Sequence, residues 1–480
     1  MPFDAVQPNI LWICTDQQRY DTINALGNSH IHTPHLDRLV TEGVAFTHAF
    51  CQTPICTPSR AAFLTGMYPS TVHACTNGNS HWAEAAPLVT KLLADAGYDG
   101  GLAGKLHLAG AQGRIEPRPS DDGYRVFHWS HHPMPDWPDG HAYADWVAAQ
   151  GFDLVEMYRH PERIPPELHQ STWCADMAIE FVQEQRTKPW FMSVNCFDPH
   201  APFNPPQSYL DRYDPAELPA PSYRVTDPTA QSRLEGVDFQ TAPRDPETFG
   251  AREIKAAYYA MIELIDWNVG RMLEALERSG QRENTLVIFT SDHGETLGDH
   301  GLLLKGCRFY EGLVRVPLIM SWPERFCSGL ISDALVELID VAPTLLDAVD
   351  LPIASRMQGR SLLPILTGSA DPHTHREFVR SEYYHTLNPA ERPDIELNIT
   401  PNSPKIRGSY ATMVRDRRYK LVVYHGHEEG ELFDLEHDPE EFENLWDHPE
   451  YRDIRFALMK RSFDALALAV DIGPEQIVYY

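Results

Sequence analysis

Long apolar segments are missing from this 480-residue sequence. It contains no stretch of about eighteen apolar residues, the length that a membrane-spanning helix needs. The first residues, MPFDAVQPNILWIC, have no basic start and no long apolar segment ahead of a small-residue cleavage site, so no secretory signal is recognisable there. We therefore expect a cytoplasmic protein that has no membrane partner.

Cysteine is scarce and irregularly spaced. The chain has eight cysteines, without the dense, regular spacing of a disulfide scaffold or the paired CxxC spacing of a zinc site. We expect most of them to be reduced thiols. They are Cys14, Cys51, Cys56, Cys75, Cys174, Cys196, Cys307 and Cys327.

Positive charge is in deficit. Lysine and arginine total 40 against 68 aspartates and glutamates, which gives a formal net charge of -28. Such a chain repels nucleic acid and acidic membrane surfaces, so neither is an expected partner. An anionic substrate would need a local pocket of positive charge.

Four short apolar runs each end in polar residues that can carry chemistry. They are residues 9–14 before TDQQ, 286–290 before SDHGE, 190–197 before DPH, and the less apolar 98–104 before KLH. Unbroken apolar runs indicate strands covered on both faces, hence a mainly parallel sheet between helices. Ligands of such sheets bind beyond the carboxyl ends of the strands. We therefore expect an α/β fold with a large, mainly parallel sheet, and one crevice for all four polar groups.

Helical periodicity and the order of the elements predict two structural units. Helices are expected at 33–44, 174–186 and 254–280. Strand and helix signals alternate to about residue 370, and short antiparallel strands and a helix at 449–469 follow. We predict an α/β domain over 1–375 and a smaller C-terminal α+β subdomain with an antiparallel sheet over 376–480.

Two stretches, 113–170 and 202–248, do not follow this alternation. Long irregular segments of compact domains are often either lids or surface excursions. The first is crowded with His, Trp and Pro. We expect 113–170 to be an insertion that faces the substrate, and we do not expect a second metal site there.

Two acidic pairs at strand ends predict a metal site. Asp16 with Gln17, and Asp292 with His293, bring together two carboxylates, one amide oxygen and one imidazole. Converging carboxylates repel each other unless a positive charge lies between them. Oxygen ligands favour Ca²⁺, Mg²⁺ or Mn²⁺, and the imidazole adds weight to Mn²⁺ or another transition metal. Helix caps and loop acids are the alternative interpretation of either pair alone.

The segment CTPSRAAFLTG, residues 56–66, predicts a reactive cysteine. Pro58 suits the first turn of a helix, so Cys56 would lie beside exposed backbone N–H groups and the positive end of the helix dipole. Arg60, one turn further on, adds fixed positive charge. A thiol in these surroundings ionises readily. The alternative is a small buried cysteine with no chemical role.

These residues resemble the type I sulfatases of the alkaline phosphatase superfamily. CTPSR fits their C-x-P-x-R signature, which directs oxidation of the cysteine to formylglycine. The resemblance covers nearly the whole chain in order and implies an alkaline phosphatase-like fold. The other segments that carry it are Asp16 with Gln17, GKLH (104–107), DPHAPF (198–203), SDHGETLGDHGLLLK (291–305) and ELFDLEHDPEE near the C-terminus.

The resemblance implies a role for each matching residue. Formylglycine made from Cys56 would be the nucleophile and a metal ligand, and Arg60 would hold and orient it. Lys105 and Lys305 resemble the lysines that clamp the sulfate oxygens, with a surface lysine as the alternative for Lys305. His107 and His200 match the histidines that move protons, and His200 also contacts the substrate. Asn77 matches a substrate-binding position of part of the superfamily, and the metal ligands would be Asp16, Gln17, residue 56, Asp292 and His293.

The resemblance also implies a reaction and partners. Two hydroxyls on the hydrated aldehyde would act in turn: one attacks the sulfur of a small anionic ester, and the other later collapses and expels sulfate. The metal would be Ca²⁺, with Mn²⁺ or Mg²⁺ as alternatives. A formylglycine-generating enzyme would act on the chain during maturation. The apolar tail IVYY at 477–480 is a possible contact in a homo-oligomer, or else a frayed terminus.

Two positions depart from the commonest sulfatase pattern. Many members have Asp where Gln17 stands and Asn where His293 stands. The pairs found here resemble choline sulfatases and phosphonate monoester hydrolases, whereas Lys105 and His107 are sulfatase-like. Hydrolysis of sulfate monoesters is therefore the leading prediction, with a phosphonate monoester or phosphodiester hydrolase as the alternative. A catalytically silent binding protein would lack a ligand or the nucleophile, and none is missing.

Overall fold

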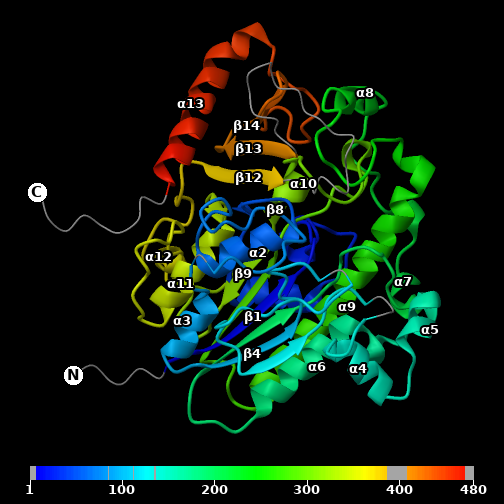
Figure 1. Cartoon of the computed structure of the whole chain (residues 1–480), viewed down its shortest axis with the longest axis vertical. Coiled ribbons are helices and arrows are strands. Elements are labelled where there is room, and N and C mark those ends of the chain that lie inside the picture. The colour runs from blue at the N-terminus through cyan, green and yellow to red at the C-terminus, as the bar shows by residue number, and fades with distance from the viewer. Residues whose placement is uncertain (1–6, 85, 112, 134–136, 386–407, 471–480) are drawn as a thin grey trace, which may run out of the picture.

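A large central sheet organises the molecule (Figure 1). The computed structural model describes residues 7–84, 86–111, 113–133, 137–385 and 408–470. Its largest sheet has eight strands in the order β10-β2-β9-β7-β1-β6-β4-β5. Their bounds are β10 (Leu330–Ser332), β2 (Val44–Phe46), β9 (Leu318–Ser321), β7 (Thr285–Ser291), β1 (Asn9–Thr15), β6 (Trp190–Asn195), β4 (Asp99–Gly104) and β5 (Val126–Trp129).

The four strands expected from the sequence are the adjacent strands β7, β1, β6 and β4. Neighbours among them pair in parallel, and β5 extends the parallel part beyond β4. Only around β9 does the direction change, because β9 is antiparallel to both β7 and β2. The prediction of a mainly parallel sheet is confirmed, and the carboxyl ends of the four strands meet at one edge.

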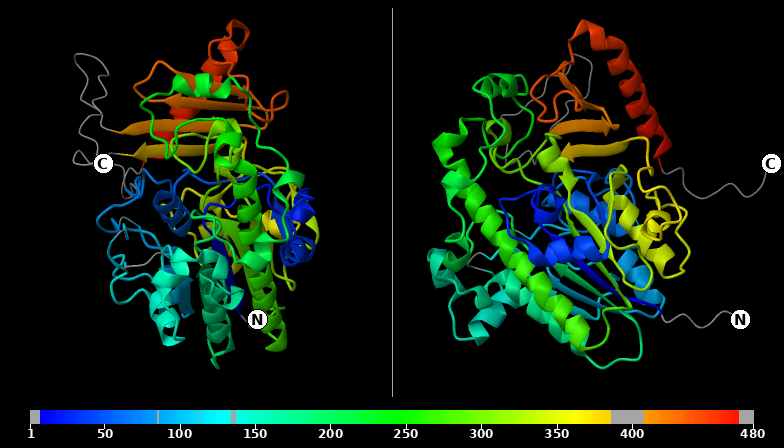
Figure 2. Two further views of the ribbon diagram at one scale, coloured as in Figure 1. Left: turned by 90° about the vertical axis from the view of Figure 1, so that its right-hand side faces the viewer. Right: turned by 180° about the vertical axis from the view of Figure 1, so that it is seen from behind.

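Helices cover both faces of this sheet, which explains the unbroken apolar strands. Along β1, Ile10 and Trp12 belong to the core on the side of α2 (Cys56–Thr65), α3 (Val89–Asp95) and α11 (Val341–Ala348). Leu11 and Ile13 belong to the opposite core, shared with α1 (Pro34–Glu42), α6 (Gln170–Gln183) and α9 (Ala251–Arg278). Successive side chains of a strand point to opposite faces, so both sets must be apolar. Figure 2 shows the long helix α9 running along one face. The three helices predicted in this part of the chain are confirmed.

A second, four-stranded antiparallel sheet lies at the C-terminal end of the chain. Its order is β12 (Val379–His385), β13 (Ser409–Arg415), β14 (Tyr419–Tyr424), β15 (Gly430–Asp434). Helix α13 (Arg452–Leu468) covers it through Leu458, which packs on Leu421 and Leu432. The predicted antiparallel sheet and terminal helix are thus present, and the domain boundary at 376 stays a prediction.

A small sheet links the two larger ones. It consists of β11 (Val336–Glu337), β3 (Ala49–Phe50) and β8 (Arg315–Val316). The backbone N–H of Glu382, in β12, donates to the carbonyl of Gln52, just after β3, at 2.8 Å. The C-terminal sheet is therefore tied to the segment that leads into Cys56.

The segment 113–170 is more regular than the sequence suggested. It contains β5, which completes the edge of the main sheet, followed by α4 (Ala142–Ala149) and α5 (Leu154–Arg159). Strand β5 was not predicted because its sequence, VFHW, is half polar. An edge strand needs fewer apolar residues than a central one. The remaining short helices are α7 (Gln207–Leu210), α8 (Asp227–Ser232), α10 (Glu311–Val314) and α12 (Leu363–Leu366), with 3-10 turns at Asn24–Leu26, Pro161–Arg163, Pro166–Leu168, Pro215–Glu217, Pro246–Phe249, Asp299–Gly301, Leu338–Asp340 and Pro449–Tyr451.

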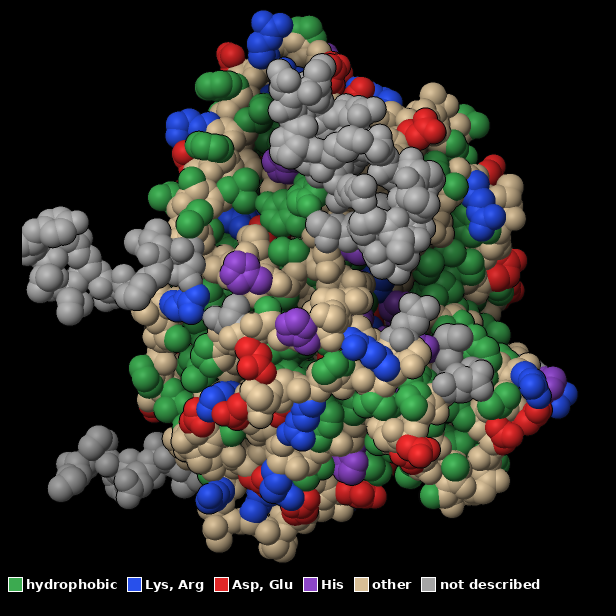
Figure 3. Space-filling view, in the orientation of Figure 1, with side chains coloured by type: hydrophobic (Ala, Val, Ile, Leu, Met, Phe, Trp, Pro, Cys, Tyr) green, Lys and Arg blue, Asp and Glu red, His purple; other side chains and the backbone are tan. Residues whose placement is uncertain are grey.

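The surface and the thiols agree with an ordinary globular chain. On the face shown in Figure 3, acidic and basic side chains are interspersed among apolar and neutral ones. All eight cysteines are free, as expected. Within the described ranges, we find no helix whose length and apolar character would let it cross a membrane. The tail at 477–480 lies outside the described residues.

Candidate active site

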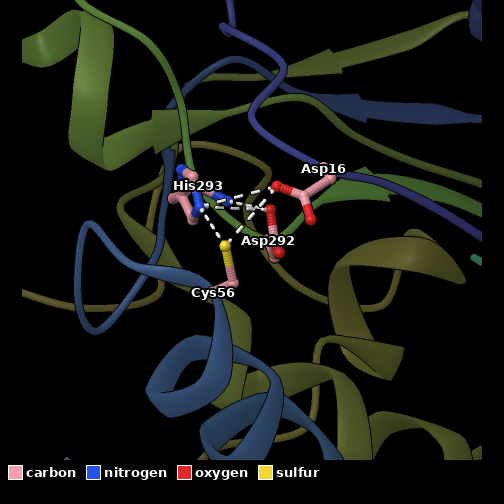
Figure 4. Close-up of side chains that lie close together, drawn as sticks. All are labelled: Asp16, Cys56, Asp292 and His293. Carbon is pink, nitrogen blue, oxygen red and sulfur yellow. Dashed lines mark hydrogen bonds and ion pairs between the residues drawn. The ribbon is translucent and has the colours of Figure 1, made fainter. Parts of the chain in front are cut away.

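The polar residues after the strands converge on Cys56 (Figure 4). Asp16 directly follows β1, Asp292 and His293 directly follow β7, and Cys56 is the first residue of α2. One ligand atom from each of these four side chains lies within 4.8 Å of all the others. All four residues are buried, and Cys56 is the most exposed of them at 2%. The predicted cluster therefore forms, at the edge of the sheet where it was expected.

The start of α2 places the thiol. The helix begins at Cys56, as the sequence predicted, and every residue in it is buried. The backbone N–H of Thr57 donates to Oδ1 of Asn77 at 2.9 Å. Asn77 thus caps the helix beside the thiol, and its predicted contact with substrate stays a prediction.

Arg60 ties the carboxylates to the neighbouring loop. Its Nε donates to Oδ2 of Asp292 at 2.8 Å, and its Nη1 donates to the carbonyl of Lys105 at 2.8 Å. Its Nη2 lies 3.5 Å from Oδ2 of Asp16. A planar guanidinium suits this fork of contacts, which fixes both acids relative to α2.

Two buried lysines supply the local positive charge that the sequence required. Lys105 pairs with Asp16, and Nζ of Lys305 lies 2.9 Å from Sγ of Cys56 and 3.2 Å from Nε2 of His293. Each lysine is 1% exposed, so Lys305 is not a surface lysine. Burial raises the pKa of the Cys56 thiol, but Lys105, Lys305 and His293 outweigh it and hold that pKa well below its usual value. The site therefore favours negative charge at residue 56.

Gly104 permits this placement of Lys105. Its φ is +109°, and a Cβ there would lie 2.0 Å from the carbonyl oxygen of Asn195. Only glycine tolerates both the conformation and the close approach of β6. The chain can therefore turn at the end of β4 and direct Lys105 to the site.

The two predicted proton-transfer histidines lie in different environments. His107 is 8% exposed, and burial together with Lys105 lowers its pKa to about 3, so it is neutral near pH 7. His200 is half-buried, its Nδ1 is 2.6 Å from the carbonyl oxygen of Ala201, and its ring packs on Phe197 with a centroid distance of 4.6 Å. A carbonyl oxygen only accepts, so Nδ1 donates to it and Nε2 of His200 is left for proton exchange.

The donor set fits a divalent cation. Oε1 of Gln17 is buried and has no hydrogen-bond partner among the described residues. The backbone N–H of Gln17 donates to Oδ1 of Asp292 at 3.0 Å, so this residue joins the same cluster. An orphaned buried acceptor costs free energy unless something binds it. Two carboxylates, an imidazole and this amide oxygen match the ligand preferences of Ca²⁺, Mg²⁺ or Mn²⁺.

Two buried glutamates beside the site were not predicted from the sequence. Glu116 accepts hydrogen bonds from the backbone N–H groups of His107, Leu108 and Ala109 and from Nε1 of Trp129. Because His107 has a φ of 56°, these bonds hold a left-handed turn that a side chain disfavours. Glu295 lies within the SDHGE segment and contacts Gln17. The SDHGE motif was the only sequence feature that indicated Glu295. No sequence feature indicated Glu116.

Replacing Lys305 by alanine will lower kcat/KM for a sulfate ester by about 10² to 10³, the usual cost of losing one preorganised charge stabiliser. We expect this because Nζ lies within hydrogen-bond distance of residue 56, the predicted nucleophile. Steady-state kinetics will test this, with the exposed Lys188→Ala as a matched control. Kinetics of Lys305→Ala that match wild type would contradict the assignment.

The chain resembles known proteins over nearly its whole length. The sulfatase family model matches residues 8–351, and the model of the N-sulphoglucosamine sulphohydrolase C-terminal region matches 298–467. The chain is 28% identical to an arylsulfatase of Clostridium perfringens, covering 93% of this chain and 92% of the relative. It is 29% identical to the multifunctional alkaline phosphatase superfamily protein PehA of Trinickia caryophylli, covering 92% of each. The crystal structure of a phosphonate monoester hydrolase of Agrobacterium radiobacter superposes with a TM-score of 0.82 at 26% identity, covering 97% of this chain and 96% of that one.

Fold and site together define a hydrolase of the alkaline phosphatase superfamily. More narrowly, the chain belongs to the sulfatase family and is a sulfuric ester hydrolase.

Proposed function

We propose that this enzyme hydrolyses sulfate monoesters, in the manner of an arylsulfatase, with formylglycine made from Cys56 as the nucleophile. One observation carries the proposal: the side chain of Cys56 lies at the start of a buried helix, beside the candidate metal ligands and the ammonium group of Lys305. The motif around Cys56 supports its modification, and a formylglycine-generating enzyme is the implied maturation partner.

A divalent metal would supply positive charge at the nucleophile, and formylglycine would supply a hydrated aldehyde with two hydroxyls. Asp16, Gln17, Asp292, His293 and residue 56 would hold the metal, for which we propose Ca²⁺, with Mn²⁺ or Mg²⁺ as alternatives.

The remaining residues would bind the sulfuryl group and move protons. Lys105 and Lys305 would bind the sulfuryl oxygens, whose negative charge grows during transfer. His200, at the half-buried rim, would protonate the leaving oxygen. Neutral His107 would accept a proton from the side chain of residue 56, and Arg60 would keep the carboxylates aligned.

A second function has specific support. A phosphonate monoester or phosphodiester hydrolase would use the same nucleophile, and the phosphonate monoester hydrolase structure overlays nearly the whole chain. Gln17 and His293 are the positions that favour this alternative, whereas Lys105 and His107 favour sulfate. Cytoplasmic location and a homo-oligomeric state remain predictions.

Matched aryl esters will separate the two functions. We expect kcat/KM for an aryl sulfate to exceed that for the same aryl phosphonate monoester and for the corresponding phosphodiester by at least about tenfold. The ratio of these constants is the measure of specificity. Steady-state assays with one leaving group make the comparison direct. A higher value for the phosphonate or the diester would overturn the sulfate assignment.

A further inference from the structure

The buried carboxylate of Glu295 lies behind the candidate metal ligands. Glu295 is 0% exposed. Its Oε2 accepts a hydrogen bond from Nε2 of Gln17, and its Oε1 accepts from the backbone N–H groups of Leu297, at 3.0 Å, and Leu304. None of the proposed catalytic roles uses this residue.

A carboxylate in this position decides which end of the Gln17 amide faces it. Ionised glutamate can only accept hydrogen bonds, whereas the glutamine amide donates through nitrogen and accepts through oxygen. Glu295 therefore binds Nε2, and Oε1 of Gln17 is left buried and without a hydrogen-bond partner among the described residues, so it is available as a ligand. Gln17 itself has a φ of 72°, so its backbone also needs support from the surrounding residues.

The same carboxylate fixes the segment that carries Lys305. Leu297 and Leu304 have φ values of 53° and 71°, which are unfavourable for residues with a side chain. Glu295 binds the N–H group of each. Leu304 directly precedes Lys305, so one carboxylate restrains both a metal ligand and a sulfate-binding lysine.

We propose that Glu295 is a positioning residue that sets the amide orientation of Gln17 and thereby the affinity of the site for a divalent cation. Partners of this kind, one shell behind the metal ligands, typically change metal affinity by about 10 to 100-fold when they are replaced. The proposal rests on the proposed function only in assuming that the cluster binds a divalent metal.

The variant Glu295→Gln tests orientation with little change in volume. Its amide oxygen still accepts from Leu297 and Leu304, but its amide nitrogen would face Nε2 of Gln17. Two donors repel, so Gln17 must rotate its amide and present nitrogen to the metal. We expect the Kd for Ca²⁺ or Mn²⁺ to rise by about 10 to 100-fold. Titration calorimetry on the full-length, metal-stripped protein measures it without any substrate.

A compensating variant separates orientation from simple damage. In Glu295→Gln combined with Gln17→Glu, the donor and the acceptor exchange places: Gln at 295 donates to one oxygen of Glu at 17, and the other oxygen faces the metal. We expect the Kd of this double variant to return to within about threefold of wild type, a strong coupling between the two positions. Glu382→Gln alters another buried, N–H-binding carboxylate, one that lies outside the site, and should leave the Kd unchanged.

The outcomes are decisive. A wild-type Kd for Glu295→Gln, a double variant no better than the single one, or a wild-type protein that binds neither Ca²⁺ nor Mn²⁺ would each overturn the proposal. Because the readout is binding, a protein that shows the expected metal affinities but hydrolyses no sulfate ester would refute the proposed function and leave the role of Glu295 standing.

Discussion

Replacing Cys56 by serine will abolish sustained turnover, with a fall in steady-state kcat of about 10⁴-fold or more, as for the loss of other essential nucleophiles. Serine has one hydroxyl, which can attack sulfur but then has no neighbouring hydroxyl to expel sulfate. At most one turnover per molecule should follow, and a sulfate ester should accumulate on residue 56. Rapid-quench kinetics and intact-protein mass spectrometry will measure both.

Cys56→Ala provides the matched control, because it removes the nucleophile without offering a hydroxyl. It should show neither a burst nor an added sulfate, and an unchanged Tm would show that the fold is kept. Continuous multiple turnover by the serine variant would contradict the mechanism. So would a fully active wild-type enzyme whose residue 56 is an unmodified thiol in every molecule.

Replacing His200 by alanine will have an effect that depends on the leaving group. A poor alkoxide leaving group needs a proton as its bond to sulfur breaks, whereas a nitrophenolate leaves without one. We expect kcat/KM to fall by about 10² to 10⁴ for an alkyl sulfate and by less than about tenfold for a nitrophenyl sulfate. The half-buried position of His200 leaves it accessible to a leaving group.

His128→Ala is a suitable control, since His128 is another half-buried histidine, in β5. It should leave the kinetics with both esters unchanged. The clearest measurement is the Brønsted slope, the dependence of log kcat/KM on the pKa of the leaving group, for wild type and His200→Ala. The slope should be steeper in His200→Ala. Equal losses on both substrates would remove His200 as the acid.

Much of the fold was predictable because its signals are local. Each central strand is an unbroken apolar run, as burial on both faces demands, and each major helix carries its own periodicity. The edge strand β5 was missed for the converse reason, because its burial is incomplete. Strand β12 was likewise not predicted as a strand. Its sequence RSEYYH is polar, although most of the strand is buried.

The chemistry of the site was predictable to the same extent. Asp16, Cys56 and Asp292 stand directly at strand or helix ends, where the geometry of a parallel sheet brings them together. The contacts of Asp16 and Cys56 with Lys305 depended on burial that no local pattern reveals. The alternative of a surface lysine is excluded by the structure, because Lys305 is 1% exposed and its Nζ lies 2.9 Å from the thiol.

By itself, the amino-acid sequence determined the α/β class, the strand ends that carry the reactive groups and the sulfatase motif at Cys56, because each depends on residues adjacent in the chain. Only the tertiary structure decided how those groups are held. Glu295 binds Gln17 across 278 positions of sequence, and Glu116 supports the strained turn at His107. Such contacts form between segments that meet through folding, and a buried carboxylate binds whichever N–H groups the surrounding backbone directs toward it.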